Sequence, residues 1–333
     1  MNGAAVTFRY SSLQDLPDRL RGAVIAIGNF DGVHRGHQTV LETALGFARE
    51  HDCPALVLTF EPHPRRLFQP DRPLFRITPA AMKAHILGRL GFDGVVELAF
   101  TREFAGLTAD QFVDEILVGG FAARQVVTGF DFHFGRNRQG GPAFLMEAGE
   151  TRGFHVTLVD AFRDEVAEVV SSSRVRERLG SGDLAGANDL LGYRYRVAGE
   201  VVRGKQLGRT LGFPTANMAL PDDVMLRHGI YAVRFIRADG SIHDGVASFG
   251  RRPTVDEDGA ALLETHVFGF DEEIYGETCT VALCAFLRDE EKFDTLEALT
   301  EQMRRDAEEA RAILSALQPL SGLDRELTFA DGA

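Results

Sequence analysis

The segment whose residue types could do chemistry most directly is GNFDGVHRGH, residues 28–37. It sets His34 and His37 three residues apart in a turn punctuated by glycines. Glycine lets the backbone approach a ligand closely, and a helix that begins near Gly36 would offer unpaired N–H groups to a phosphate. Two imidazoles facing that phosphate would stabilise the negative charge that develops during nucleotidyl transfer.

Two histidines at this spacing also suit a surface position or one half of a metal site. Zinc would require a third and a fourth ligand, and no cysteine lies near enough in the sequence to supply one. Histidines set between glycines directly after the apolar run 23–30 form a more specific pattern. This pattern favours phosphate chemistry over the other two interpretations.

Two further clusters in the first half could bind an anion or lie beside a ligand. In VSSSRVRER, residues 170–178, three serines precede Arg174 and Arg176. Hydroxyl and N–H groups at a helix start, followed by guanidinium groups, suit an anion, although an ordinary helix cap with a solvated basic face explains the pattern equally well. The tripeptide PHP would hold its central residue, His63, rigidly at the end of a strand.

The second half contains a glycine-rich segment, GKQLGRTLGFPTAN, residues 204–217. Its glycines recur every four residues, as on a helix-packing face, but Pro214 and the preceding strand-like VVRG favour a loop. It is not a Walker A loop, because no Ser or Thr follows the Gly-Lys pair. Thr215 and Asn217 would give this loop an oxygen-rich end that suits Mg²⁺ and phosphate groups.

Glu264 is the best candidate for a general base in the second half. It lies in LLETHVFGF, where strand alternation would put Glu264, His266 and Phe268 on one face. A carboxylate in that position could accept the proton of a substrate hydroxyl as the hydroxyl attacks a γ-phosphate. A strand glutamate that simply faces solvent is the commoner case.

The elements that must position these groups change character along the chain. The first 180 residues alternate strand-like and helix-like patterns, which predicts a parallel α/β sheet covered by helices. We expect strands at 23–30, 55–60, 94–100 and 125–129, and helices around 40–48, 79–90 and 109–117. Ligands in such sheets bind beyond the carboxyl ends of the strands, where GNFDGVHRGH, TFEPHP and TGFDFHFG lie.

Beyond about residue 188 the chain contains several short strand patterns with few helices, which predicts a small antiparallel barrel or sandwich. An amphipathic helix follows, with apolar residues three and four apart from Leu296 to Leu317, and we interpret that stripe as a packing face. The predicted organisation is one domain over residues 1–184, a second over 185–318 and a flexible tail over 319–333.

Composition argues against several classes of protein. The 333 residues include 49 acidic and 36 basic side chains, a net charge of −13, which argues against non-specific binding to nucleic acid. The longest apolar run, 281–287, is too short for a membrane helix, and the charged N-terminus lacks the apolar core of a signal peptide. Cys53, Cys279 and Cys284 lack disulfide or metal-binding spacing, so we expect reduced thiols in a cytoplasmic protein.

The motifs of the first half, GNFDGVHRGH, TFEPHP, TGFDFHFG and SSSRVR, together resemble the adenylyltransferase module of the bacterial bifunctional riboflavin kinase/FAD synthetases. The resemblance implies a Rossmann-like HxGH nucleotidylyltransferase domain that transfers AMP from ATP to FMN, giving FAD and pyrophosphate, with Mg²⁺. It implies catalytic contacts of His34 and His37 with the ATP phosphates and a flavin side formed by His63 and Asp131. The further nucleotide and phosphate contacts that it implies are Gly28, Asn29, Phe30, Asp31, Ser172, Arg174 and Arg176.

The motifs of the second half, GKQLGRTLGFPTAN, GIYAVR, GVASFGRRPTV and LETHVFGFDEEIYG, resemble the riboflavin kinase module of the same family. The resemblance implies a six-stranded antiparallel barrel with a C-terminal helix, which phosphorylates riboflavin to FMN. Thr215 and Asn217 match the motif that binds the Mg²⁺-nucleotide, and Glu264 matches the catalytic base. The residues expected in a mobile loop over the nucleotide are Gly204, Lys205 and Gly208.

Three residues depart from the family's pattern: His133 replaces an Arg, Ser248 an Asn and Gly269 an Asp. None of them falls on an expected catalytic residue, so we expect both activities. The partners would be riboflavin, FMN, FAD, ATP, ADP and pyrophosphate, with no other tightly bound organic cofactor, and a homo-oligomer is compatible with the sequence. The alternatives are a nucleotidyltransferase with another acceptor and an inactive second module, and a non-catalytic flavin or nucleotide sensor.

Overall fold

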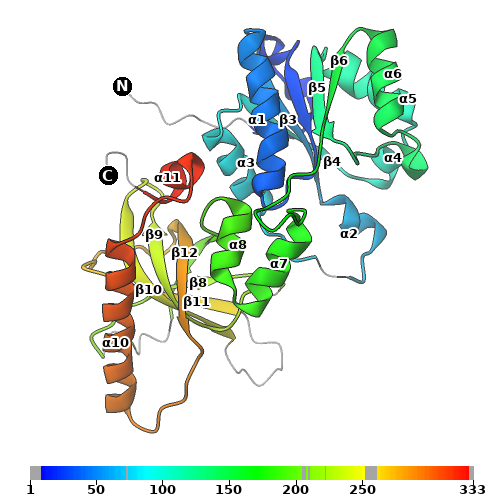
Figure 1. Ribbon diagram of the computed structural model, residues 1–333. Helices are drawn as coiled ribbons and strands as arrows, with labels where there is room; N and C mark the ends of the chain where they lie inside the picture. The colour runs from blue at the N-terminus through cyan, green and yellow to red at the C-terminus, as the bar shows by residue number, and fades with distance from the viewer. Residues whose placement is uncertain are drawn as a thin grey trace. The chain divides into compact units, whose positions relative to one another are not determined.

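The computed structural model describes residues 9–329, apart from residues 73, 205–207, 209–210, 222 and 252–260 (Figure 1). The chain forms two compact units, residues 1–172 and residues 173–333. The first unit contains the parallel sheet and the second the closed barrel, as the predicted change from an α/β half to a β half requires.

The first unit is an α/β domain. Its strands are β1 (Arg9–Tyr10), β2 (Val24–Ile27), β3 (Ala55–Glu61), β4 (Gly94–Ala99), β5 (Gln125–Gly129) and β6 (His155–Val159). Its α-helices are α1 (Arg35–Glu50), α2 (Pro64–Phe68), α3 (Ala80–Arg89), α4 (Arg102–Ala105), α5 (Ala109–Gln111) and α6 (Pro142–Arg152). A π-helix, η3 (Phe112–Gly120), continues α5, and short 3₁₀ helices are η1 (Leu13–Asp15), η2 (Asp18–Leu20) and η4 (Arg136–Arg138).

The six strands form one sheet in the order β1-β4-β3-β2-β5-β6, and every adjacent pair is parallel. The predicted parallel sheet is therefore confirmed. Because β2 lies between β3 and β5, the loops that follow these three strands all leave the same edge of the sheet. Those loops begin the segments GNFDGVHRGH, EPHP and FDFHFG.

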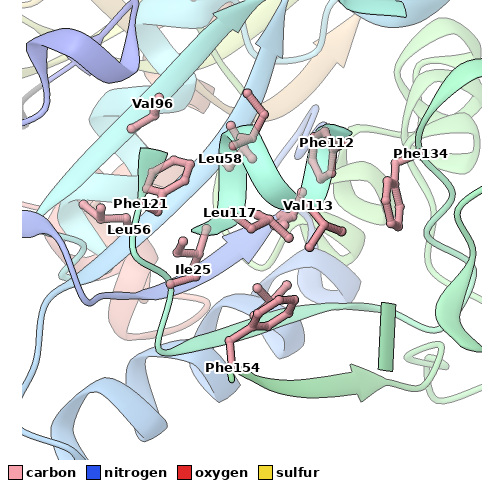
Figure 2. Packing of buried hydrophobic residues seen from close by; sticks show 14 of the residues in the cluster. Ile25, Leu56, Leu58, Val96, Phe112, Val113, Leu117, Phe121, Phe134 and Phe154 are labelled. Atoms are coloured by element: carbon pink, nitrogen blue, oxygen red, sulfur yellow. The ribbon is translucent and has the colours of Figure 1, made fainter. Parts of the chain in front are cut away.

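The sheet is held in place by an apolar core on one face (Figure 2). Figure 2 shows Phe112, Val113 and Leu117 of η3 in one cluster with Ile25 of β2 and Leu58 of β3. Strands buried on both faces are continuously apolar, and β2 reads VIAI with every residue buried. A fully buried central strand leaves little freedom for its last residue, so the loop that follows starts from a fixed point.

In its described residues, the second unit is a closed β-barrel with four helices. The chain passes through α7 (Ser172–Ser181), which begins at the last residue of the first unit, and α8 (Leu184–Leu191). The strands are β7 (Arg196–Val202), β8 (Ala216–Ala219), β9 (Gly229–Ile236), β10 (Ile242–Arg251), β11 (Ala261–Val267) and β12 (Thr278–Arg288). They pair antiparallel in the closed order β10-β11-β8-β7-β12-β9, and α10 (Leu296–Ser315) and α11 (Gly322–Thr328) follow. Of the two predicted alternatives, the structure has the barrel.

The connecting helix α8 packs against barrel strand β12. The side chain of Asn188 in α8 donates to the Leu283 carbonyl at 3.2 Å and accepts from the Tyr195 amide at 2.7 Å. Because of this packing the second unit begins before α8, and the predicted domain boundary between residues 184 and 185 lies inside that unit.

Helix α10 lies along β9, β10 and β12 and buries Ala307, Ala310 and Leu314. These residues belong to the stripe that the sequence predicted, so its interpretation as a packing face is confirmed. The guanidinium of Arg288 donates to both oxygens of buried Asp306, at 2.8 and 2.7 Å, which ties the helix to β12. None of the helices in the described part of the chain combines the length and the apolarity that crossing a membrane requires.

The expectation of a flexible tail over residues 319–333 is wrong for its described part, which contains α11. Asp324 is fully buried, pairs with the guanidinium of Arg194 and accepts the Arg194 backbone N–H at 3.0 Å. The Arg234 guanidinium lies 4.1 Å from the centre of the Phe329 ring. Local sequence patterns carry no signal for a charge pair about 130 positions apart, so they do not predict that this segment is anchored.

Replacing Asp324 with Ala should lower the free energy of unfolding of the barrel unit by about 3–5 kcal/mol. The substitution leaves the buried guanidinium of Arg194 without its carboxylate. Urea unfolding followed by circular dichroism measures the change. Glu326→Ala removes an exposed carboxylate from the same helix and should cost no more than about 0.5 kcal/mol, so equal losses in the two variants would contradict this account.

Candidate active sites

The loop after β2 is shaped by a close contact between Gly28 and Phe30. A Cβ atom on Gly28 would come within 2.9 Å of the Phe30 ring, so only glycine lets the ring fold back over the strand end. Phe30 itself has a positive φ of 48°, a conformation that is strained for a bulky residue and is found most often at functional sites. The predicted contact residues Gly28 and Phe30 thus set the path of the loop.

Asp31 anchors this loop from within the protein. It is buried, and its carboxylate accepts from the Thr78 backbone N–H at 3.1 Å and lies 3.5 Å from Nε of Arg76. The Thr78 hydroxyl in turn accepts from the Gly32 backbone N–H at 2.8 Å. These contacts give Asp31 a role in holding the loop to the segment before α3.

The two histidines of the motif lie face to face at the start of α1. His34 is the N-cap of the helix, and its Nδ1 accepts from the His37 backbone N–H at 3.2 Å. The two rings stack with centroids 3.6 Å apart and planes 17° apart, and the edge of Phe30 packs against His37. A Cβ atom on Gly36 would lie 3.3 Å from the His34 ring, so glycine gives this stack its room.

The surroundings of His37 favour a neutral imidazole. Burial, and then the charges of His34 and Lys83, hold the pKa of His37 well below its ordinary value. Its Nδ1 is buried and has no hydrogen-bond partner among the described residues. A polar atom without a partner at the N-terminus of a helix is suited to a ligand that supplies one.

The serine-arginine segment begins with a contact to the histidine loop. The Ser172 hydroxyl donates to the Asp31 carbonyl at 2.8 Å, so its proton is used to hold the loop after β2. Arg174 and Arg176 lie half-buried on α7 in the second unit, whereas the histidines lie in the first. The structure thus joins Ser172 to the histidine loop.

His63 and Asp131 follow the strands on either side of β2. His63 caps α2, where its Nδ1 accepts from the Arg65 backbone N–H at 3.2 Å, and the ring stays partly exposed. Asp131 is exposed two residues after β5, and its carbonyl lies 2.7 Å from Nδ1 of His133. Since β3 and β5 both pair with β2, these residues start from neighbouring strand ends.

Sequence reasoning missed a buried charged group beneath this edge. Lys83 of α3 is 1% exposed, and Arg76 donates to both carboxylate oxygens of Glu61 at 3.0 and 2.7 Å. Burial raises the pKa of Glu61, but the hydrogen bonds and charges of Arg76 and Lys83 outweigh it and bring that pKa below its ordinary value. A lysine in line with Ile86 and Leu87 on an apolar helix face was the signal that could have revealed the group.

In the second unit, strand register brings the predicted kinase residues together. Glu264 of β11 lies directly opposite Asn217 of β8 and directly opposite Ser248 of β10. Residues directly opposite in adjacent strands share one face of the sheet. Leu263 and Thr265 on the other face are fully buried, which confirms the predicted alternation around Glu264.

Two residues of the glycine-rich segment, Gly204 and Gly208, lie close to this row of residues. A Cβ atom on Gly204 would lie 2.6 Å from Nδ2 of Asn217, and one on Gly208 would lie 3.7 Å from Cγ2 of Thr215. The Asn217 amide donates to the Thr215 carbonyl at 3.2 Å. The structure therefore brings together Gly204, Gly208, Thr215, Asn217 and Glu264, while Lys205 lies outside the described residues.

His266, two positions after Glu264 on β11, contacts the segment that carries Thr215. Its Nδ1 lies 2.9 Å from the Pro214 carbonyl, and its ring packs edge-on against Phe213. Phe213 and Phe268 are buried in the cluster that includes α10. The oxygen-rich corner at Thr215 is thereby fixed to β11 and to the core.

Comparisons with known proteins match both units. The sequence model of FAD synthetase matches residues 16–174, and that of riboflavin kinase matches residues 191–314. Bifunctional riboflavin kinase/FMN adenylyltransferases from Haemophilus influenzae and Pseudomonas fluorescens are 40% and 41% identical to this chain, over 89% and 90% of it and 96% of their own lengths. The chain belongs to the bifunctional riboflavin kinase/FMN adenylyltransferase family.

A solved structure supports the fold. A Streptococcus pneumoniae protein, described as a macrolide-efflux protein, is similar with a TM-score of 0.79 and 31% sequence identity. The match covers 92% of this chain and 99% of the other. The family models and the sequence relatives confirm the resemblance that the motifs indicated.

The backbone conformation and the strand pairing describe two of the residues that depart from the family's pattern, Gly269 and Ser248. Gly269 follows β11 with a positive φ of 63°, a conformation that glycine adopts without strain. Ser248 pairs directly with Glu264, so it is the departure closest to the kinase base.

The stability of the first unit should fall in mild acid because of His37. Since the pKa of His37 is lower in the folded chain, the unfolded chain binds the proton first as the pH falls through the ordinary histidine pKa of about 6.5. The unfolding free energy should therefore drop between pH 7 and pH 5, and His37→Gln should remove part of that drop.

Urea unfolding at several pH values measures the effect, and His155→Gln, which changes an exposed histidine of the same unit, is the matched control. The control should retain the wild-type pH dependence. An unchanged pH dependence in His37→Gln would show that this imidazole does not take part.

Proposed function

We propose that the two activities of this family occupy separate sites, with FMN adenylylation at the edge formed by β3, β2 and β5 and riboflavin phosphorylation at the paired strands β11 and β8. The matched ranges support this division, since FAD synthetase matches residues 16–174 and riboflavin kinase matches residues 191–314. The two domains would correspond to the two compact units, residues 1–172 and residues 173–333.

In the kinase site, Glu264 would act as the general base. It would accept the proton of the terminal ribityl hydroxyl of riboflavin, whose oxygen then attacks the γ-phosphorus of ATP and displaces ADP. The observation that carries the assignment is the direct pairing of Glu264 with Asn217, because it brings the base next to the nucleotide loop. Gly204 and Gly208 allow the backbone of that loop to approach the phosphates closely.

The residues of the kinase site fit Mg²⁺ bound together with ATP. The Thr215 hydroxyl and the Asn217 amide oxygen are hard oxygen donors, as this ion prefers, and Asn217 is held by its bond to the Thr215 carbonyl. Within the described residues there is no group of three His, Cys, Asp or Glu side chains that could hold a metal without the nucleotide. When bound, the ion would neutralise charge on the transferring phosphoryl group.

In the adenylyltransferase site, an FMN phosphate oxygen would attack the α-phosphorus of ATP while the bond to pyrophosphate breaks, with no covalent intermediate on the chain. The start of α1, with His34 and His37, would stabilise the charge on the phosphates. His37 would act in its neutral form, which its surroundings favour, and would offer one N–H donor to the phosphates, so that activity is lost when the ring binds a proton. Arg174 and Arg176 would bind the departing pyrophosphate as bidentate donors.

The remaining residues of the adenylyltransferase site would position substrates. Gly28, Asn29, Phe30 and Asp31 would shape the nucleotide loop, with Ser172 holding it through the Asp31 carbonyl. His63 and Asp131, which follow the strands on either side of β2, would border the flavin nucleotide.

We also propose that the enzyme works in the cytoplasm. The described chain has three free cysteines and no disulfide, as expected in a reducing compartment. Burial raises the pKa of the Cys284 thiol to about 12, so this group stays protonated and unreactive.

A product time course that starts from riboflavin, ATP and Mg²⁺ tests the whole assignment. FMN should appear first and FAD after it, with pyrophosphate released in step with FAD. A chain that makes neither product but binds flavin or ATP tightly would be a sensor, and one that adenylylates a different acceptor would be a related transferase.

Replacing Glu264 with Ala should reduce FMN formation by at least about 100-fold, because the substrate hydroxyl loses its base. Adenylylation of supplied FMN should stay within about twofold of wild type. Measuring both reactions on one preparation makes the second activity the control for folding. Loss of both activities in a folded protein would contradict separate sites.

Replacing His37 with Ala should have the opposite effect. FAD formation from supplied FMN should fall by about 100-fold, the loss expected for removing one group that stabilises developing charge. Phosphorylation of riboflavin should continue at the wild-type rate. Substitution of exposed His155 by Ala is the matched control and should leave both reactions unchanged.

A further inference from the structure

A buried lysine lies beneath the edge assigned to adenylylation. Lys83 projects from α3, is 1% exposed, and its ammonium makes three hydrogen bonds. It donates to the Thr59 hydroxyl at 2.8 Å, to the Asn29 carbonyl at 3.2 Å and to the Glu61 carboxylate at 3.3 Å. An ammonium has three N–H donors, and all three are accounted for.

The three acceptors belong to two different segments, and the reaction requires these segments to keep a fixed position relative to each other. Asn29 lies in the loop between β2 and the histidines. Thr59 and Glu61 lie in the last three residues of β3, just before His63. Thr59 also donates to the Asn29 carbonyl, at 3.3 Å. Lys83 therefore cross-links the start of the histidine loop to the strand end that carries His63.

Burying this charge is costly, and the chain supplies several groups that compensate for it. Burial lowers the pKa of Lys83, while the carboxylates of Glu61 and Glu97 oppose that change. Arg76, which also faces this group, is paired with Glu61 and lies near Asp31. Packing alone would be served equally well by an apolar side chain of similar length, because buried ion pairs are seldom more stabilising than apolar packing.

We propose that Lys83 is a positioning residue for adenylyl transfer, which fixes the Asn29 carbonyl and the Glu61 end of β3 relative to each other. The inference rests on the proposed assignment of FMN adenylylation to this edge. Lys83 is enclosed by protein acceptors, so it acts through the loop and does not touch a substrate. A displacement of about 1 Å at reacting atoms can cost about 100-fold in rate, which is the scale on which such a cross-link matters.

Lys83 has a second measurable effect, because its charge is among those that lower the pKa of His37. The groups whose charges act on His37 are His34 on the motif and Lys83 on α3. Removing the Lys83 charge should therefore raise the pKa of His37, which moves the acid limb of the adenylylation pH profile to higher pH. A role limited to stability would not move that limb.

The test compares Lys83→Met with wild type in the full-length enzyme. FAD formation from FMN and ATP should fall about 10- to 100-fold in kcat/KM, mostly in kcat, and the acid limb should shift upward. Phosphorylation of riboflavin should stay within about twofold. Lys292→Met changes an exposed lysine and should leave both reactions and the pH profile as in wild type.

Thr59→Val keeps the shape of the side chain and removes one of the three acceptors. This variant replaces Lys83→Met as the test if Lys83→Met does not fold. It should lower adenylylation by about 3- to 10-fold while the kinase reaction continues. Lys83→Arg, which keeps the charge, should leave the acid limb in its wild-type position and recover part of the rate.

The inference is overturned if folded Lys83→Met adenylylates FMN within twofold of wild type with the same pH profile, or if Thr59→Val does so when Lys83→Met does not fold. Failure of the proposed function is a different result, since wild type itself would then form no FAD from FMN.

Discussion

Strand register is the constraint on which both sites depend, because each site is assembled from residues that meet only when neighbouring strands are correctly aligned. In the barrel, Glu264 lies opposite Asn217 and Ser248. A slip of one residue would turn Glu264 toward the interior, where Leu263 and Thr265 now lie. In the α/β unit, parallel pairing of β2 with β3 and β5 makes the three loops begin at one edge.

The two sites use that constraint in different ways. The barrel carries Glu264 on the strand itself, so this carboxylate is as rigid as the sheet, and His266 of the same strand holds the loop with Thr215. The α/β edge places its histidines after the strand, on a loop and a helix start. Such a loop needs further anchors, and it has them in Asp31 and Lys83.

Much of this organisation could be predicted from the sequence because local patterns determine it. The alternating elements of the first half, the barrel strands and the face that carries Glu264 follow from periodicity, and the glycines around His34 and His37 follow from the space those rings need. The buried charges could not be predicted in the same way. The partners of Lys83 lie 22 to 54 positions away, and Asp324 lies 130 positions from Arg194. Such pairs have no local signature, which is also why the last described residues were expected to be a loose tail.

The pairing of Arg194 with Asp324 has a consequence for how the barrel unit is made. Arg194 stands just before β7, the first barrel strand, and its carboxylate partner is supplied near the end of the chain. Synthesis proceeds from the N-terminus, so on the ribosome this guanidinium has no such partner until α11 has emerged. The α/β unit does not depend on a segment made so late, since all of its strands precede the barrel strands in the sequence. Folding during synthesis is therefore staggered, with the barrel completing this ionic contact only after α11 has been made.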